Sequence, residues 1–311
     1  MKDNSLSKFR KVAVLMGGDS SERDISMMSG TAVAAGLEKA GYDVARVEIS
    51  GHSDLSLPDG TEAVFIALHG AFGEDGGVQN LLEQLAIPYT GSGPESSRVS
   101  FDKILARTAF ELSGVPVPLG MIAQKGQPVD FSRIGVPLVV KPPRQGSSVG
   151  ISIVKDEANI QAALDEAFMY GDEALIEDYI PGREWTVPIV GTEVLPIIEI
   201  TPKLDGGWYS WNAKYKASGT TAYSFPEDDP ANEEMASLVR GLALRAFNSV
   251  DARGLGRIDF RISSEDGKPY ALELNSIPGF TETSLLPKAA AKRGIAFEKL
   301  CAMIMESAKC G

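Results

Sequence analysis

The stretch GRIDFRISSEDGKPYALELN, residues 256–275, joins two alternating runs of polar and apolar residues through a turn signal. The period of two over 256–262 and 270–275 predicts β-strands, and Glu-Asp-Gly-Lys between them favours a tight turn. Side chains two positions apart in a strand share a face of the sheet. We therefore expect a hairpin with one polar face made up of Arg257, Asp259, Glu273 and Asn275.

The polar face of this hairpin has two interpretations. Carboxylate and amide oxygens with an arginine beside them suit Mg²⁺ that is shared with nucleotide phosphates. A solvated strand face with cross-strand charge pairs would carry the same residue types. The opposite face is expected to be apolar, filled by Ile258, Phe260, Leu272 and Leu274.

Upstream, strand and helix patterns alternate over the first ninety or so residues. The strand patterns cover 11–16, 43–49, 63–68 and 87–90, and the helical patterns cover 23–40 and 78–86. This alternation implies parallel pairing and a Rossmann-like sheet. Ligands of such sheets bind beyond the carboxyl ends of the strands, which here carry glycine-rich loops.

From residue 94 the pattern changes to that of an α+β protein. Helices are expected over 96–112, 157–170 and 231–250 and twice more at the C-terminus, with strands over 136–141, 151–154, 174–179, 184–190 and 193–200. The fold class is therefore α/β, with α+β character in the later lobes. We expect three domains, at 1–94, 95–181 and 182–311.

The composition limits the function classes. With 311 residues, 43% apolar and 23% charged, the chain is typical of a soluble globular protein. It lacks the run of about 18 apolar residues that a membrane span needs, and its start lacks a secretion signal, so we expect a cytoplasmic protein. A net charge of -12 argues against nucleic-acid and membrane partners but allows a small anionic ligand. Two cysteines near the C-terminus make zinc or disulfide chemistry an unattractive interpretation.

Other candidate residues each have a structural alternative. The glycine-flanked loop 146–150 after Lys141 could cradle a phosphate or be a flexible turn, although it does not match a Walker A loop. Glu22 could reach over the sheet edge or belong to the first turn of a helix. His69 could be an active-site group or an ordinary loop residue. The aromatic loop 204–229 could be a lid, an apolar plug or an oligomer contact.

With these residues considered, the chain resembles the D-alanine:D-alanine ligase family of the ATP-grasp superfamily. The resemblance runs nearly end to end and depends on long motifs in the family's order. These are GGDSSERDISMMSG (17–30), FIALHGAFGEDGGVQ (65–79), PYTGSG (88–93), DK (102–103), VVKPPRQGSSVG (139–150), EDYIPGREWTV (177–187), AKYKASGTTAYSFP (213–226), GRIDFRI (256–262) and LELNSIPGFTETSLLP (272–287).

The resemblance implies a fold, an activity and cofactors. A Rossmann-like substrate domain would precede a small central ATP-grasp lobe and a C-terminal lobe that carries the metal site and a lid loop. ATP would phosphorylate the carboxylate of one D-alanine, and the amine of a second D-alanine would displace phosphate, giving a dipeptide for peptidoglycan precursors. Two Mg²⁺ ions, for which Mn²⁺ can substitute, and a homodimer are also implied.

The family's site residues carry over to matching positions of this sequence. Lys103 and Lys141 match residues that hold ATP phosphates, and Ser147, Ser148 and Val149 lie in the loop that covers them. The adenine hinge matches Glu177, Asp178, Tyr179 and Ile180, and the ribose ligand matches Glu184. The metal ligands match Asp259, Glu273 and Asn275, and the oxyanion site matches Arg257 and the backbone N–H of Gly279.

The substrate residues carry over in the same way. A network that positions the first substrate matches Glu22, Ser147 and Tyr215, with His69 near the first carboxylate. The second carboxylate would be bound by Lys214 and Ser284. Tyr215, where phenylalanine would suit a hydroxyl acceptor, favours D-alanine over D-lactate. A D-alanine:D-lactate ligase, another carboxylate–amine ligase and a silent nucleotide-binding module stay as alternatives, whereas an oxidoreductase is disfavoured because GxGxxG is missing after the first strand.

Overall fold

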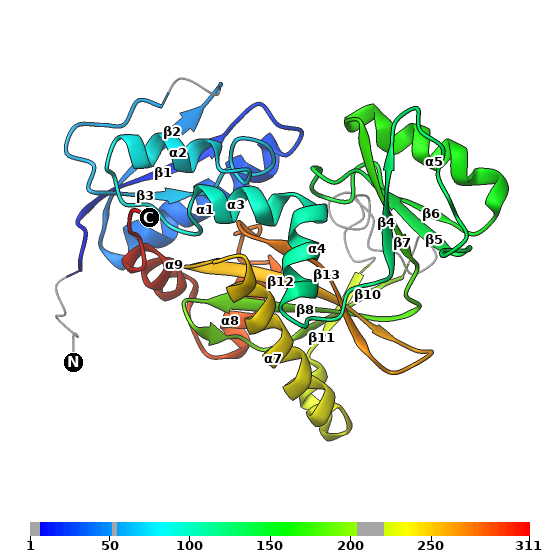
Figure 1. Ribbon diagram of the computed structural model, residues 1–311. Helices are drawn as coiled ribbons and strands as arrows, with labels where there is room; N and C mark the ends of the chain where they lie inside the picture. The colour runs from blue at the N-terminus through cyan, green and yellow to red at the C-terminus, as the bar shows by residue number, and fades with distance from the viewer. Residues whose placement is uncertain (1–6, 52–54, 204–220) are drawn as a thin grey trace.

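The computed structural model describes residues 7–51, 55–203 and 221–311, and within them the chain forms three sheets in succession (Figure 1). These sheets lie inside the predicted ranges 1–94, 95–181 and 182–311. The mixed α/β fold class is therefore confirmed, while the exact domain boundaries stay a prediction.

The first sheet is parallel, with the order β2-β1-β3, as the alternating pattern predicted. Its elements are β1 (Lys11–Gly17), α1 (Arg23–Ala40), β2 (Asp43–Ile49), β3 (Ala63–Ile66) and α2 (Gly77–Gln84). Helix α1 ends where Gly41 takes the left-handed conformation at φ 101° and donates its N–H to the carbonyl of Glu38. The predicted strand over 87–90 is reduced to isolated bridges at Tyr89, one parallel to Val64 and one antiparallel to Lys309.

The second sheet is antiparallel, with the order β4-β7-β5-β6. Its elements are β4 (Gly120–Gln124), β5 (Leu138–Lys141), β6 (Ser152–Val154), α5 (Ile160–Ala167) and β7 (Glu173–Asp178). Short 3-10 turns at Glu157–Asn159 and Phe168–Tyr170 flank α5 and account for the longer helix that was predicted. Strand β4 was not predicted, because its exposed Ile122 disturbs the alternation of polar and apolar residues.

The third sheet has the order β11-β10-β8-β12-β13, with β9 beside β8. Its elements are β8 (Gly182–Val190), β9 (Glu193–Val194), β10 (Ile198–Pro202), β11 (Thr221–Ser224), α7 (Glu233–Ser249), β12 (Leu255–Ser263) and β13 (Pro269–Asn275). The single strand predicted over 193–200 is wrong, because β9 and β10 are separate and pair with β8 at different places. Strand β11 was not predicted, since it lies at the end of the aromatic loop.

The single helix predicted over 96–112 is also wrong, because the chain forms α3 (Pro94–Phe101) and α4 (Lys103–Leu112). Between them Asp102 adopts an extended backbone at φ −88° and ψ 107°. Its carboxylate accepts the N–H groups of Ile104 and Leu105, which caps a new helix at this point. The residue after Asp102, Lys103, therefore starts a helix instead of continuing one.

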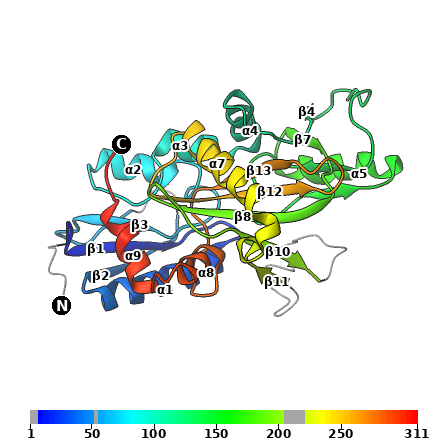
Figure 2. The same cartoon turned by 90° about the horizontal axis from the view of Figure 1, so that it is seen from below.

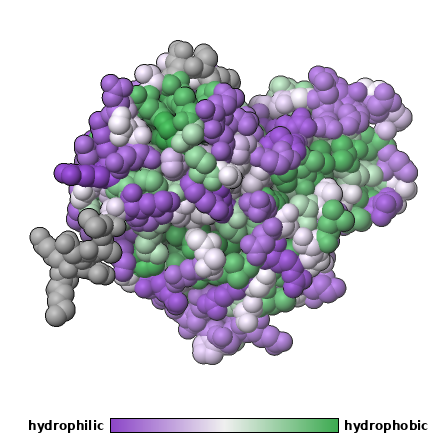
Figure 3. All heavy atoms as spheres, turned by 60° about the vertical axis from the view of Figure 1, so that its left-hand side comes forward, coloured by the Kyte–Doolittle hydropathy of each residue, from purple (hydrophilic) through white to green (hydrophobic). Residues whose placement is uncertain are grey.

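The C-terminal helices α8 (Leu285–Lys292) and α9 (Phe297–Glu306) return to the first sheet. Ile304 and Cys301 belong to the same apolar cluster as Val12 and Val33, and Figure 2 shows α9 beside α1 and the first sheet. The C-terminal helices thus complete the apolar core of the first sheet. Over the face that Figure 3 shows, polar side chains predominate and apolar ones form smaller patches between them. Among the helices described here, none has the length and apolar character to cross a membrane.

Candidate active site

A cavity of about 340 Å³ lies where the sheets meet, and it collects most of the predicted catalytic and substrate residues. The predicted residues that line it are Glu22, His69, Lys103, Ser147, Arg257, Glu273, Asn275, Gly279 and Ser284. They come from the loops after β1 and β3, from α4, from the β5–β6 loop, from the third sheet and from the segment between β13 and α8. Residues more than 200 positions apart in the chain therefore meet in one space.

The loop between β5 and β6, residues 142–151, reaches across to the first sheet. Ser147 donates its hydroxyl hydrogen to the Oε1 atom of Glu22. At the neighbouring Gly146, an added Cβ would lie 2.7 Å from the other carboxylate oxygen of Glu22, so a side chain at this position would displace the end of Glu22. The structure thus brings Glu22 and Ser147 together, as the resemblance predicted.

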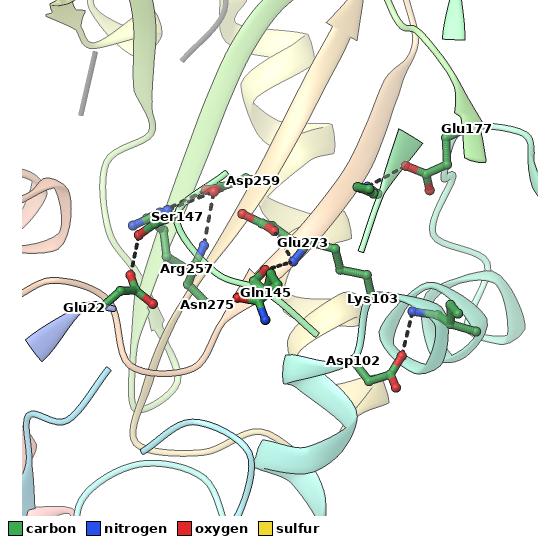
Figure 4. Close-up of polar contacts among 12 residues, drawn as sticks. Glu22, Asp102, Lys103, Gln145, Ser147, Glu177, Arg257, Asp259, Glu273 and Asn275 are labelled. Atoms are coloured by element: carbon green, nitrogen blue, oxygen red, sulfur yellow. Dashed lines mark hydrogen bonds and ion pairs between the residues drawn. The ribbon is translucent and has the colours of Figure 1, made fainter. Parts of the chain in front are cut away.

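The hairpin of β12 and β13 forms as predicted, with Asp259 opposite Glu273 and Arg257 opposite Asn275. The guanidinium of Arg257 donates to both carboxylate oxygens of Asp259 at 2.9 Å, and Nδ2 of Asn275 lies 3.2 Å from one of them. The buried Asp259 also accepts the hydroxyl of Thr186 from β8. Figure 4 shows the side chains of Arg257, Asp259 and Asn275 gathered on one side of the hairpin.

One residue of the hairpin departs from strict alternation. Asp259 pairs with Glu273, and the next residue, Phe260, pairs with Ala271, so the register skips Leu272 and forms a bulge. Leu272 consequently lines a second cavity on the polar side. The prediction that Leu272 fills the apolar face is therefore wrong, whereas Ile258, Phe260 and Leu274 do lie in the core.

Lys103 stands between the two cavities at the start of α4. Its Nζ donates to the carbonyl of Gln145 at 2.6 Å and lies 3.3 Å from Oε2 of Glu273 (Figure 4). The side chain is only 7% exposed, so its charge is largely shielded from solvent. An ammonium held this way can interact strongly with an anion in either cavity.

The second cavity, of about 70 Å³, lies between the second and third sheets. The predicted residues that line it are Lys103, Lys141, Ser148, Glu177, Asp178, Tyr179, Ile180, Glu184, Asp259 and Glu273. Lys103 and Glu273 line both cavities, so the two cavities are direct neighbours. Val149 lines neither cavity, and Lys214 and Tyr215 lie outside the described residues.

Ion pairs balance the buried charges around the second cavity. The Nζ atom of Lys141 lies 2.5 Å from Oε2 of Glu177, and Arg107 pairs with the other oxygen at 2.9 Å. Arg261 lies 3.4 Å from a carboxylate oxygen of Glu184 and donates to the carbonyl of Ile180. The sequence interpretation missed both arginines, although alternation along β12 places Arg261 on the same face as Asp259.

His69 and Glu74 are two buried titratable residues in the wall of the first cavity. Burial lowers the pKa of His69, an effect that the charge of Glu22 partly opposes. Burial, followed by the charge of Glu22, raises the pKa of Glu74 to about 8, although its Oε2 accepts the N–H of Gly70 at 2.6 Å. Sequence reasoning missed Glu74, for which the only signal was a carboxylate inside the glycine-rich loop after β3.

The donor set can be tested for its fit to a metal ion. In the described part of the chain, no group of three or more His, Cys, Asp and Glu side chains is arranged so that it could hold a metal ion by itself. The hairpin instead offers two carboxylates and an amide, Asp259, Glu273 and Asn275, beside the cationic Lys103 and Arg257. Such hard oxygen donors suit Mg²⁺ that takes its remaining ligands from a nucleotide. Asp259, Glu273 and Asn275 therefore fit a bound Mg²⁺ ion.

Comparison with known proteins agrees with this geometry. A family model described as D-ala D-ala ligase C-terminus matches residues 123–306, and one described as D-ala D-ala ligase N-terminus matches residues 49–92. The chain belongs to the D-alanine–D-alanine ligase family. This membership confirms the resemblance drawn from the motifs.

Individual relatives match almost the whole chain. The D-alanine–D-alanine ligase of Syntrophotalea carbinolica is 42% identical over 302 residues, covering 96% of both proteins. That of Acidiphilium cryptum is 40% identical over 304 residues, covering 97% of this chain and 99% of the relative. The crystal structure of D-alanine–D-alanine ligase from Bacillus anthracis complexed with ATP superimposes with a TM-score of 0.83 at 33% identity, covering 96% of this chain and 97% of that one. The family's α/β fold therefore extends over nearly the full length.

Proposed function

We propose that this protein joins two D-alanine molecules to D-alanyl-D-alanine at the expense of ATP. The observation that carries the proposal is the meeting of two cavities at Lys103 and Glu273. One cavity has the residues expected for an amino acid, and the other has those expected for a nucleotide. Membership of the ligase family and the likeness to an ATP-complexed relative support the same assignment.

The second cavity suits the nucleotide. Its walls include the apolar side chains of Val139, Ile151 and Leu272, which can cover an adenine ring, and the carboxylate of Glu184, which can accept from ribose hydroxyls. From there the triphosphate would run toward the shared Lys103. We assign Lys141 and the loop with Ser147, Ser148 and Val149 to the phosphates, and residues 177–180 to the base.

Asp259, Glu273 and Asn275 would hold Mg²⁺, with Mn²⁺ as a substitute. When bound, the metal would neutralise charge on the phosphate oxygens during transfer. Arg257, which pairs with Asp259, would donate to a reacting carboxyl oxygen. The backbone N–H of Gly279 would be a second donor to that oxygen, which gives an oxyanion site.

The first cavity suits the two amino acids. Glu22, held by Ser147, would bind the ammonium group of the first D-alanine, and His69 would lie near its carboxylate. Ser284, whose Oγ accepts the N–H of Thr281, would contact the second carboxylate together with Lys214. Tyr215 would complete the Glu22 network and favour an amine acceptor.

The reaction proposed for this site balances as two steps. The carboxylate oxygen of the first D-alanine attacks the γ-phosphorus of ATP, the bond to ADP breaks, and an acyl phosphate forms. The amine nitrogen of the second D-alanine then attacks the acyl carbon and loses a proton, and inorganic phosphate leaves with the electrons of the broken C–O bond. The chain's residues supply orientation and charge stabilisation for both transfers.

The test is phosphate release measured with single amino acids and with D-lactate, together with the mass of each product. We expect release to depend on D-alanine and to be absent with L-alanine, with D-alanyl-D-alanine as the product. ATP turnover that ignores D-alanine would contradict the proposal. A depsipeptide formed from D-lactate would instead identify the D-alanine:D-lactate ligase.

The setting of the reaction belongs to the same proposal. The dipeptide would serve peptidoglycan precursor synthesis, and the need for ATP together with the buried free thiol of Cys301 suits the reducing cytoplasm. A homodimer is proposed from the family resemblance alone. Sedimentation of the purified protein would test the oligomeric state.

A further inference from the structure

The loop 142–151 is fastened to the first residues of α4 by three contacts, apart from its contact with Glu22. The backbone N–H of Lys103 donates to the carbonyl of Pro143 at 2.9 Å, and its Nζ donates to the carbonyl of Gln145 at 2.6 Å. Between them, Nε of Arg144 donates to Oδ2 of Asp102 at 2.7 Å. The motifs that contain Arg144 and Asp102 were noted in the sequence, yet neither residue received a role there.

The two carboxylate oxygens of Asp102 accept hydrogen bonds from different partners. Oδ1 accepts the N–H groups of Ile104 and Leu105, at 3.0 and 3.3 Å, and so caps α4. Oδ2 faces Arg144. The Asp102 side chain is 6% exposed, so its negative charge depends on these partners and on the positive end of the helix.

Arg144 also reaches the second sheet. Its Nη2 atom donates to Oε2 of Glu173 on β7 at 2.9 Å, and Nε2 of Gln124 on β4 donates to the other oxygen of Glu173 at 3.1 Å. One guanidinium therefore ties the loop both to the sheet that carries it and to the helix that carries Lys103. The fork of an arginine suits this double attachment, which a single ammonium could only partly replace.

We propose that Arg144 is a positioning residue that holds Lys103 and the loop 142–151 in the geometry required to bind the nucleotide phosphates. It acts through Asp102 and does not itself contact the nucleotide. The inference rests on the proposed function, because it assumes that Lys103 contacts ATP. Lys103 is the first residue of α4, directly after the capping residue Asp102. A shift of Asp102 therefore also moves the ammonium of Lys103 relative to the phosphates.

The experiment compares ATP binding and steady-state kinetics of Arg144→Gln, Asp102→Asn and the double variant. Asparagine at 102 keeps a cap acceptor for α4 and loses only the charge pair. A third cavity is lined by Arg98 together with Asp102 and Arg144. The matched control is Arg98→Gln, because Arg98 lines this cavity but pairs with Glu95 on the surface, at 2.6 and 2.8 Å. Thermal unfolding of each variant checks that it folds.

We expect Arg144→Gln to raise the KM and Kd for ATP about ten-fold, the size of a lost charged hydrogen bond, with a smaller effect on kcat. Asp102→Asn should act alike, and the double variant should be no worse than either single one. Arg144→Lys should recover part of the affinity, and Arg98→Gln should bind ATP like the wild type.

Two failures can be told apart. If the wild-type protein does not bind ATP, the proposed function fails. If it binds ATP and Arg144→Gln binds equally well, or if the effects of Arg144→Gln and Asp102→Asn simply add, the positioning role is overturned. An equal loss of affinity in Arg98→Gln would also overturn the positioning role. It would mean that removing any positive charge from this cavity weakens ATP binding.

Discussion

Glu74 offers a direct test of the electrostatics of the first cavity. Its carboxyl is buried, and this burial, with the charge of Glu22, raises its pKa to about 8 from an ordinary value of 4.5. The folded protein therefore keeps Glu74 protonated at neutral pH. The substitution Glu74→Gln replaces the neutral acid with a neutral amide of nearly the same shape, which can still accept the N–H of Gly70.

The sign of the effect follows from where the proton is held. Below pH 4.5 the carboxyl of Glu74 is protonated in both the folded and the unfolded chain, and above about pH 8 it is ionised in both. Between these values only the folded chain holds the proton, so the free energy of unfolding falls as the pH rises across this window. At about 1.36 kcal/mol per pH unit, the full loss is on the order of 5 kcal/mol at most.

The assay is urea unfolding at about pH 5 and about pH 8.5, followed by the fluorescence of tryptophans such as the buried Trp185. We expect Glu74→Gln to resemble the wild type at the lower pH and to be more stable by a few kcal/mol at the higher one. Both proteins contain the other titrating groups, including His69. The difference between their free energies of unfolding at the two pH values therefore reports on Glu74. The variant Glu265→Gln, in the exposed turn of the hairpin, is the control.

Parallel pH profiles of the wild type and Glu74→Gln would refute this reasoning. They would mean that Glu74 ionises in the folded protein near its ordinary pKa. The ionised carboxylate of Glu74 would then be stabilised by water. Water would have to reach this side chain despite its burial.

Three further substitutions test the site and its frame. Glu273→Gln should lower kcat at least about 100-fold with little change in Tm, because it weakens a proposed metal ligand; a large loss of Tm with normal kinetics would contradict that role. Gly182→Ala should destabilise the protein by about 2 kcal/mol or more in urea unfolding, since its Cβ would lie 2.0 Å from the carbonyl oxygen of Ile262 at φ 137°. The control Gly241→Ala, in an open position of α7, should stabilise the protein. Leu272→Ala should weaken ATP binding about ten-fold and leave the KM for D-alanine unchanged. An unchanged Kd for ATP would show that Leu272 does not contact the nucleotide.

Local patterns predicted the elements whose boundaries are set by neighbouring residues. The bounds of α1 and β2 agree with the predicted ranges, because periodicity and the glycine at 41 act within a few positions. The break at Asp102 escaped this reasoning, since apolar periodicity continues through it and only the capping geometry ends α3. Strand β4 escaped as well, because its pairing with β7 comes from tertiary contacts.

The candidate site was predictable where motifs align residues with a strand. Alternation alone placed Asp259 and Glu273 on one face of the hairpin, and the family motifs added Glu22 and Ser147. The bulge at Leu272 was not predictable, because it depends on how Phe260 and Ala271 pair across the hairpin. Partners such as Arg261 for Glu184 depend on the packing of distant strands, for which one sequence carries no local signal.

The site is balanced by its own charges, and this explains how it can bury them. The lysines and arginines around the two cavities face carboxylates, in the pairs Lys103–Glu273, Lys141–Glu177, Arg107–Glu177, Arg257–Asp259 and Arg261–Glu184. An anion alone would have to compete with these carboxylates, and a cation alone would have to compete with the lysines and arginines. A nucleotide accompanied by its metal supplies both signs, so the phosphates can take the cationic partners while the metal takes the carboxylates. If the proposed function holds, this exchange of partners would leave no buried charge without compensation, and nucleotide binding would weaken without the metal.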